Sequence, residues 1–411
     1  MTLAGTAAES LATKADAYGV ASDETRLTWR LLAGRGTRAG LPAILARPST
    51  TYLSLARHAI FHGLGVLGIK QGQTVLVPAY HCAAFVEPIL AFGARVVFYK
   101  VGLDCMPDLV DVSRKVDAQT RAIVAVHYFG FEAPIDRLKE LCEAHQLFLI
   151  EDCAHVLIDS AAGRALGSHG HISVFSFRKF LPLHEGACLV NNTEPGAGAV
   201  TLRAAGWRHS LRMKKHLMEK LCVDSGGLAA TLANGVQAGL KRMKRTLPCE
   251  ASTTDGVPIL KEESPSFDSS LADQPMAYLS QRVLQNSAVS RIVEQRRANY
   301  KHLLQATAGL AGITPLFPCL PTGTCPWVFP VMSSLVKDLH KQLRARGVAA
   351  AAWDGVIHPS LPIAHFPEAA QLYANLIFLP LHQDLSFATL DAMVDVLTSV
   401  ISLNAQKARP S

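Results

Sequence analysis

The chain has 411 residues, which is enough for two or three domains of ~100–200 residues each. Apolar residues make up 49% of it and charged residues 18%, below the ~25% typical of soluble proteins, so a mostly disordered or repetitive chain is excluded. No stretch reaches the ~18 uninterrupted apolar residues that a membrane-spanning helix needs, and residues 1–20 lack the basic start and apolar block of a signal peptide. We therefore expect a globular protein of the cytoplasm.

Nine cysteines are scattered along the chain, with no C-x-x-C pair and no Cys/His spacing of the kind that binds zinc. An odd number of cysteines in a large chain argues against a disulfide framework and favours reduced thiols inside a cell. We expect most of them to be small core residues, and we expect no metal site.

Residues 1–44 are rich in Ala, Thr and Gly with weak periodicity, which predicts an N-terminal arm or a first helix. Between residues 54 and 191 short β-rich runs alternate with helical stretches, of which 133–146 has the clearest helical spacing of apolar residues. Near-continuous apolar strands that alternate with helices predict an α/β fold with a mostly parallel sheet covered on both faces. The predicted strands are 74–78, 94–101, 121–129, 147–153, 172–177 and 187–192.

The rest of the chain predicts an insertion and a second domain. Residues 246–275 carry four prolines and many Ser, Asp and Glu residues, as an exposed loop or inserted segment does. A helical stretch at 276–308, a strand at 329–332 and helices near 335–346 and 387–403 follow. The predicted organisation is an N-terminal arm (1–44), a large domain (45–212), an insertion (213–275) and a smaller C-terminal α/β domain (276–411).

The strand at 147–153 ends in two carboxylates, Glu151 and Asp152. In open parallel sheets the ligand lies beyond the carboxyl ends of the strands, so an acid at this position is well placed to meet a ligand. The alternative interpretation is that Asp152 only caps the helix that follows the strand.

A second candidate is Lys179, which follows the strand at 172–177 within an otherwise apolar run. Burial lowers the pKa of an amine and makes it nucleophilic toward carbonyl carbons, although a lone lysine at a strand end more often extends its charge into solvent. The acid on the neighbouring strand favours the first interpretation. An acid for the pyridinium nitrogen and a lysine for the aldehyde carbon are the two anchors that pyridoxal phosphate needs.

Five motifs, in this order, resemble those of the DegT-type family, the sugar aminotransferases among the fold-type-I pyridoxal-phosphate enzymes. The resemblance extends from about residue 50 to residue 403 and implies a large cofactor domain followed by a small one. The motifs are LARHAIFHGLGVLGIKQGQTVLVPAYHC (55–82), TRAIVAVHYFG (120–130), LFLIEDCAH (147–155), FSFRKFLPLHEGA (175–187) and LPLHQDLS (379–386).

The resemblance implies roles for three residues around the cofactor ring. Lys179 matches the lysine that bonds to the cofactor aldehyde, and Asp152 matches the acid that keeps the pyridine nitrogen protonated. His155 matches a position, usually Gln or His, beside the ring and its hydroxyl. Some relatives replace the lysine with histidine and become dehydratases, so its retention here favours transamination.

The resemblance also implies a site for the cofactor phosphate. Ser176 matches a serine that contacts the phosphate. Arg57 and His58 fall where the family has a small-residue turn that opens a helix, and where backbone N–H groups and the helix dipole hold the phosphate. Arg57 could add a charge-assisted bond.

The chain departs from the family pattern at several positions. Only Arg178 separates the Phe-Ser-Phe stretch from Lys179, so the turn before the lysine is two residues shorter than usual. The residues of the phosphate turn are bulkier. The aromatic residue that usually stacks on the ring aligns near Cys82, which leaves Tyr80 or His81 as substitutes.

Two further residues beside these motifs are expected to be structural. His127 ends a predicted strand, where a histidine is more often a satisfied structural residue than a catalyst. Glu185 lies six residues after the lysine, and we expect it to order the turn there.

The resemblance implies transfer of an amino group, from glutamate, onto a ketone of a sugar nucleotide by a homodimer in which two subunits share each active site. Two alternatives remain open: a ketone that is not a sugar, and a non-catalytic protein that binds the cofactor. Retention of Lys179 and Asp152 argues against the second alternative. No glycine motif of a dinucleotide-binding dehydrogenase or a nucleoside triphosphatase occurs.

The net charge of +7 comes from one segment, since residues 203–245 contain ten basic and two acidic residues. Binding of nucleic acid by the whole protein is therefore not implied. The two basic clusters, 203–220 and 241–245, predict a solvated surface, a helix on a membrane surface, or a wall of the acceptor site. The position after the lysine strand favours the third interpretation, in which cations meet a diphosphate.

Overall fold

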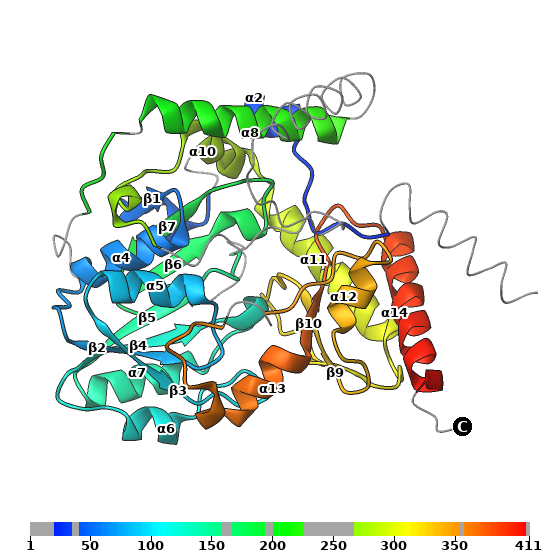
Figure 1. Ribbon diagram of the computed structural model, residues 1–411. Coiled ribbons are helices and arrows are strands. Elements are labelled where there is room, and N and C mark those ends of the chain that lie inside the picture. Colours follow the sequence, from blue (N-terminus) through cyan, green and yellow to red (C-terminus); the bar gives the residue numbers. More distant parts are fainter. Residues whose placement is uncertain are drawn as a thin grey trace, which may run out of the picture.

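The computed structural model of the chain describes residues 20–34, 41–157, 166–193, 200–204, 206–225, 267–353 and 357–407 (Figure 1). Most of the expected 213–275 insertion lies outside the described residues, as do the second basic cluster at 241–245 and residues 1–19 of the expected N-terminal arm. The domain boundaries therefore stay predictions.

Seven strands form one large sheet. In spatial order they are β1 (Thr50–Leu53), β7 (Ala187–Asn191), β6 (Ile172–Ser176), β5 (Phe148–Cys153), β4 (Thr120–Val126), β2 (Thr74–Pro78) and β3 (Arg95–Tyr99). The strands from β6 to β3 run parallel to their neighbours, whereas β7 is antiparallel to both β6 and β1. The predicted α/β fold with a mostly parallel sheet is confirmed.

The large sheet separates two hydrophobic cores, because alternate residues of a strand point to opposite faces. Val174 and Leu189 face the core that contains α4 (Ala56–Val66), whose Gly63 lies against Leu189. Phe175 and Cys188, each adjacent in sequence to those residues, face the second core. A sheet buried on both faces explains why its strands are near-continuous apolar runs.

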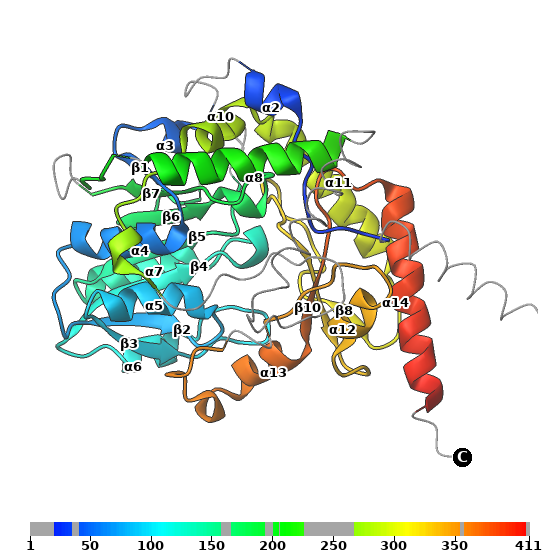
Figure 2. The ribbon, with the colours of Figure 1, turned by 45° about the horizontal axis from the view of Figure 1, so that its top comes forward.

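Helices cover both cores (Figures 1 and 2). Besides α4, the first core includes residues of α5 and α7, and the second includes residues of α8 and α10. The helices before the last third of the chain are α2 (Trp29–Ala33), α3 (Ala43–Ala46), α4, α5 (Ala83–Ala91), α6 (Leu109–Arg114), α7 (Ile135–Ala144) and α8 (Trp207–Ser225).

The C-terminal part carries a three-stranded antiparallel sheet in the order β10 (Leu376–Leu379), β9 (Phe329–Ser333), β8 (Ile313–Pro315). Its sheet and helices form the smaller α/β part that the sequence predicts. The helices after residue 267 are α10 (Tyr278–Asn286), α11 (Val289–Ala306), α12 (Leu339–Arg344), α13 (Pro367–Asn375) and α14 (Phe387–Lys407).

Helix α14 is long and apolar enough, by length and composition, to cross a membrane, with a mean hydropathy of 1.3 over Phe387–Gln406. A core helix of a globular protein passes the same test. One face of α14, with Leu390, Met393, Leu397 and Val400, is buried in the first core, and α14 contacts α11 and α12. This spacing of three and four residues is that of a helix packed against a protein.

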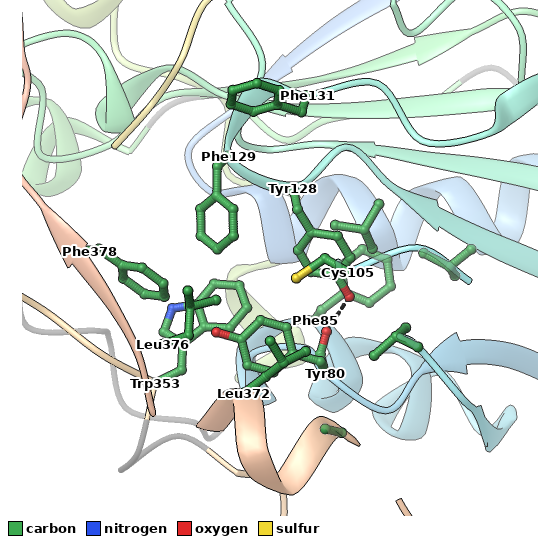
Figure 3. Packing of buried hydrophobic residues seen from close by; sticks show 14 of the residues in the cluster. Tyr80, Phe85, Cys105, Tyr128, Phe129, Phe131, Trp353, Leu372, Leu376 and Phe378 are labelled. Atoms are coloured by element: carbon green, nitrogen blue, oxygen red, sulfur yellow. Dashed lines mark hydrogen bonds between the residues drawn. The ribbon is translucent and has the colours of Figure 1, made fainter. Parts of the chain in front are cut away.

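Aromatic side chains join the C-terminal part to the strand ends of the large sheet (Figure 3). Tyr80, just after β2, lies with its ring centre 5.8 Å from Tyr128 and 4.9 Å from Trp353. Phe129 lies 5.0 Å from Phe378 of β10. The hydroxyl of Tyr128 donates a hydrogen bond to the backbone carbonyl of Tyr80. This junction forms one side of the cavity described next.

Candidate active site

A cavity opens at the carboxyl ends of the large sheet, where β5 ends at Cys153 and β6 ends at Ser176. A short 3-10 turn, Phe177–Lys179, directly follows β6 and carries the lysine. The sheet sets the spacing of the two sides, because Asp152 is paired in register with Val174. The cavity is lined by Leu55, Ala56, Arg57, Ile60, His81, Cys82, Ala84, Phe85, Asp152, Ala154, His155, Ser176, Arg178, Lys179 and Trp353.

The amine of Lys179 lies against His155 and Trp327. Its Nζ is 2.8 Å from His155 Nε2 and 4.1 Å from the centre of the Trp327 ring. Trp327 in turn stacks on His155, with ring centres 4.3 Å apart and an interplanar angle of 27°. The indole of the C-terminal part therefore holds the imidazole flat beside the lysine.

Hydrogen bonding fixes where His155 carries its proton. Burial and the nearby Lys179 lower the pKa of His155 well below its usual value, so the ring is neutral and has one N–H. Its Nδ1 accepts a hydrogen bond from the backbone N–H of Phe129 (3.1 Å), which places the proton on Nε2. That N–H then points at Lys179 Nζ, 2.8 Å away.

The turn after β4 brings the Phe129 N–H to this position. Phe129 and Gly130 have φ angles of 57° and 94°, in the left-handed region. A Cβ on Gly130 would lie 2.1 Å from the carbonyl oxygen of Cys325, so only glycine fits there. The HYFG sequence that matched the family therefore shapes the backbone that orients His155.

Asp152 faces the cavity from the end of β5 and has two protein contacts. Its Oδ1 accepts the N–H of Ala154 (2.8 Å), and its Oδ2 lies 3.0 Å from His81 Nε2. Burial by itself lowers the pKa of His81, but the contacts with Asp152 and Cys82 outweigh it and raise the pKa to about 9. His81 is therefore an imidazolium beside the carboxylate.

The N-terminus of α4 forms the opposite wall. The helix begins at Ala56 after Leu55, which makes no side-chain cap, so its first backbone N–H groups have no partner within the helix. Arg57 and Ser176 line the cavity near this end, together with Arg178. His58 does not line it: its Nδ1 is 2.9 Å from Ser54 Oγ, and its ring packs edge-on against Phe267.

The other carboxylate of β5, Glu151, is held inside the protein. It accepts N–H groups of Gly167, His169 and Gly170 and contacts His127 Nε2 at 3.0 Å, and both side chains are fully buried. These two residues and Cys153 are close enough together to hold a metal ion. The hydrogen bonds already occupy the Glu151 oxygens, however, and burial raises the pKa of the Cys153 thiol well above its usual value, so the group is suited to structure.

Glu185 links the turn after the lysine to α8. Its Oε1 accepts the N–H of Ala277 (2.7 Å), and its Oε2 lies 2.9 Å from His209 Nε2 of α8. Burial raises the pKa of Glu185 to about 7, and burial together with Arg212 lowers the pKa of His209. The pair therefore holds a single proton near neutral pH.

The comparison with known families matches the segment of the chain that contains most of the cavity residues. The model of the DegT/DnrJ/EryC1/StrS aminotransferase family matches residues 49–247, which include every cavity residue except Trp353. This segment of the chain is therefore similar to members of that family.

Curated relatives match over part of their length. A GDP-perosamine synthase of Vibrio cholerae is 36% identical over 147 residues, which are 35% of this chain and 40% of that protein. A putative L-glutamine:3-amino-2,3-dideoxy-scyllo-inosose aminotransferase of Micromonospora echinospora is 35% identical over 169 residues, 40% of this chain and 38% of that protein. The chain thus spans about 40% of the length of these relatives.

A solved structure matches over nearly the whole chain. The pyridoxal-phosphate form of a putative sugar aminotransferase from Streptococcus pneumoniae has a TM-score of 0.63 and 18% identity, and covers 98% of this chain and 96% of that chain. At this identity the likeness shows a shared fold, that of the fold-type-I enzymes of the DegT family.

The residues of the cavity fit the family cofactor, pyridoxal phosphate. Asp152 offers a carboxylate to a pyridinium nitrogen, and His81 lies beside it with its Nε2 3.0 Å from Oδ2. A lysine amine suits an aldehyde, and an uncapped helix end beside two arginines suits a phosphate.

The structure also brings in residues that the motifs did not single out. Tyr80 is fully buried in the aromatic junction, whereas His81 and Cys82 line the cavity. The sequence had named His81 only as a substitute for the aromatic residue that stacks on the ring, whereas the structure places its Nε2 3.0 Å from Asp152. Trp353 and Trp327 come from the C-terminal part, where no sequence pattern connects them to the lysine.

Proposed function

We propose that the chain is a pyridoxal-phosphate-dependent aminotransferase that moves an amino group onto the keto carbon of a sugar nucleotide. The observation that carries this proposal is the convergence of Lys179, His155 and Asp152 in one cavity beside an uncapped helix end. The expected homodimer, the cytoplasmic location and glutamate as amino donor belong to the same proposal.

When bound, pyridoxal phosphate supplies an aldehyde that takes up an amino group and a ring that withdraws electrons from the reacting carbon. Asp152 would pair with the ring nitrogen and hold a proton on it. Lys179 would hold the cofactor at its aldehyde carbon, and its Nζ would remove and return the proton of the substrate carbon.

The remaining residues orient these groups. His155 orients Lys179, whose Nζ lies 2.8 Å from its Nε2. Trp327 covers the same amine, with its ring centre 4.1 Å from Nζ. Ser176, Arg57 and the first N–H groups of α4 would hold the phosphate, with Arg178 as a further cation.

Labelling tests this proposal directly. Purified protein incubated with pyridoxal phosphate and then reduced with borohydride should carry one stable cofactor label per chain, and peptide mass spectrometry should map it to Lys179. A Lys179→Arg variant should take up no label, whereas Lys139→Arg on exposed α7 should be labelled like the wild type. A label on another lysine contradicts the assignment.

The substrates require a separate experiment. Protein loaded with pyridoxal phosphate and preincubated with glutamate or glutamine should transfer the amino group that it has taken up to a keto-sugar nucleotide. A ketone without a nucleotide is the second candidate, because the acceptor in the name of the Micromonospora relative is an inosose and no cation of α8 lines the cavity. Turnover of a free cyclic ketone, with none of nucleotide sugars, would select it.

A further inference from the structure

Helix α8 has two apolar sides, of which only one faces the protein. Met213, Leu217 and Leu221 are buried in contact with the second core. On the outward side Trp207 and Leu211, one turn apart, are 71% and 57% exposed. A surface helix needs only one apolar side for folding, and the second side stays mostly exposed in the part of the chain that the structure describes.

Cations flank the outward apolar residues. Arg208, Lys214 and Lys215 are exposed, and their spacing places them on the same side of the helix as Trp207 and Leu211. No acidic residue occurs between Trp207 and Met218. Glu219, one turn after Lys215, lies 3.7 Å from its Nζ, and both side chains are partly or mostly exposed. Asp224, nearer the end of the helix, is turned inward, where it accepts the backbone N–H of Leu27 and contacts Lys220. We call Trp207, Arg208, Leu211, Lys214 and Lys215 the α8 face.

Neighbouring helices extend this surface with further aromatic residues. α10 contacts both α8 and α2, and Figures 1 and 2 show the three helices together at the edge of the molecule. Tyr278 of α10 and Trp29 of α2 are 70% and 60% exposed. Exposed Trp and Tyr beside Lys and Arg is the composition that places a protein at a lipid headgroup layer.

We propose that the α8 face binds the surface of an anionic lipid membrane, with the helix lying in the plane of the headgroups. The cations complement anionic headgroups, and the apolar side chains between them enter the layer beneath. A nucleic acid would meet the cations but would leave Leu211 without a partner. A symmetric contact between two copies through this face would bring basic residues onto basic residues.

The α8 face lies outside the cavity, since none of its residues lines it. Within one chain, the location of these cations therefore does not support the interpretation that they form a wall of the acceptor site. The proposed membrane contact is independent of the proposed enzymatic activity, because the residues that would touch the membrane are different from those that line the cavity.

Vesicle sedimentation tests this inference on the full chain. The wild type should sediment with vesicles of phosphatidylcholine and phosphatidylglycerol, not with phosphatidylcholine alone, and should be released by salt. Lys214→Gln with Lys215→Gln should weaken partitioning about 25-fold, at roughly fivefold for each charge near the surface. Trp207→Ser with Leu211→Ser should weaken binding even at low salt. Circular dichroism should show both variants folded.

Two controls are matched to these variants. Arg137→Gln with Lys139→Gln removes two exposed charges from α7, and Leu335→Ser removes an apolar side chain that is 57% exposed, as Leu211 is. Both should sediment like the wild type. The proposal is overturned if the wild type does not sediment with anionic vesicles, or if the control variants lose as much vesicle binding as the α8 variants do. So does conversion of a dimer to monomers by Trp207→Ser with Leu211→Ser, with vesicle binding unchanged, because a second copy would then cover the face.

Discussion

The position of single protons decides what the side chains of the cavity can do. A backbone N–H fixes the tautomer of His155, because the Phe129 N–H donates to its Nδ1 and leaves the proton on Nε2, which is aimed at Lys179. At His81 it is the raised pKa that matters, because it gives the carboxylate of Asp152 a cationic neighbour.

The His81–Asp152 contact predicts an unusual titration. In the protein without added cofactor, the ring signals of His81 in an NMR pH titration should report a pKa of about 9. In Asp152→Asn the carboxylate is lost while burial and the contact with Cys82 remain, so the pKa of His81 should fall well below 9. An Asp395→Asn variant, changed on the exposed side of α14, should leave the titration where it is. A pKa near 6.5 in the wild type would contradict the pairing.

At the scale of elements, α8 is attached to the turn that follows Lys179. His209 of α8 contacts Glu185, and the rings of His184 and His216 stack with centres 4.4 Å apart. The turn and the helix are therefore joined by two neighbouring pairs, one of which titrates near neutral pH.

The Glu185–His209 pair predicts a pH dependence of stability. The pKa of Glu185 is about 7 in the fold and 4.5 when exposed, so its contribution is full below about pH 4.5 and is lost as the pH rises through 7. Glu185→Gln keeps the size and removes the charge. Between about pH 5 and pH 8, the free energy of unfolding of the wild type should fall relative to that of Glu185→Gln by on the order of 2 kcal/mol. Urea unfolding measures this difference.

Glu219→Gln provides the comparison for that experiment, because Glu219 lies on the same helix but is only partly buried. Its difference from the wild type should stay constant over the same range of pH. If the difference in free energy of unfolding between Glu185→Gln and the wild type is equally constant with pH, the Glu185 carboxylate stays ionised over this range and forms an ion pair with His209.

The sequence predicted the elements whose pattern is local. Apolar runs bounded by polar residues located β2 to β7, with β2 at the predicted residues. It did not predict β1 or β10, which have four residues each and pair antiparallel with distant strands. The helical stretch at 276–308 is two helices, since α10 ends at Asn286 and α11 begins at Val289. No glycine or proline marks that break.

The site was predictable to the extent that it lies in one stretch of chain. Asp152, His155 and Lys179 follow two adjacent strands, and the cavity contains all three. His81 and Trp353 meet them only through pairing of β2 with β4 and through packing of the C-terminal part, neither of which leaves a local pattern. The outward position of the α8 face likewise depends on how the helix packs.

At the scale of the whole molecule, the aromatic junction ties the C-terminal part to the cavity. Phe378 of β10 contacts Phe129 and Trp353, and is almost fully buried. Phe129 supplies the N–H that orients His155, and Trp353 lines the cavity. Packing between the two parts thus reaches Lys179 through Phe129 and His155.

Loss of one junction ring should therefore affect both stability and the site. Phe378→Ala leaves a cavity and should lower the free energy of unfolding by about 3–5 kcal/mol. Phe387→Ala removes a ring that is 47% exposed and should cost less than about 1 kcal/mol. Urea unfolding gives both values, and the affinity for pyridoxal phosphate should fall in Phe378→Ala alone. Equal losses in the two variants would mean that the junction does not brace the molecule.

The register of β5 and β6 has an evolutionary consequence. Asp152 and Lys179 are spaced by two strands that hydrogen-bond to each other inside the sheet, and the loops, helices and surfaces beyond them do not set that spacing. Mutations that reshape the rim of the cavity or the α8 face can therefore accumulate without moving the two anchors apart. Proteins that descend from a common ancestor with this sheet can therefore differ in the molecules and cellular surfaces that they bind while they keep the spacing of Asp152 and Lys179.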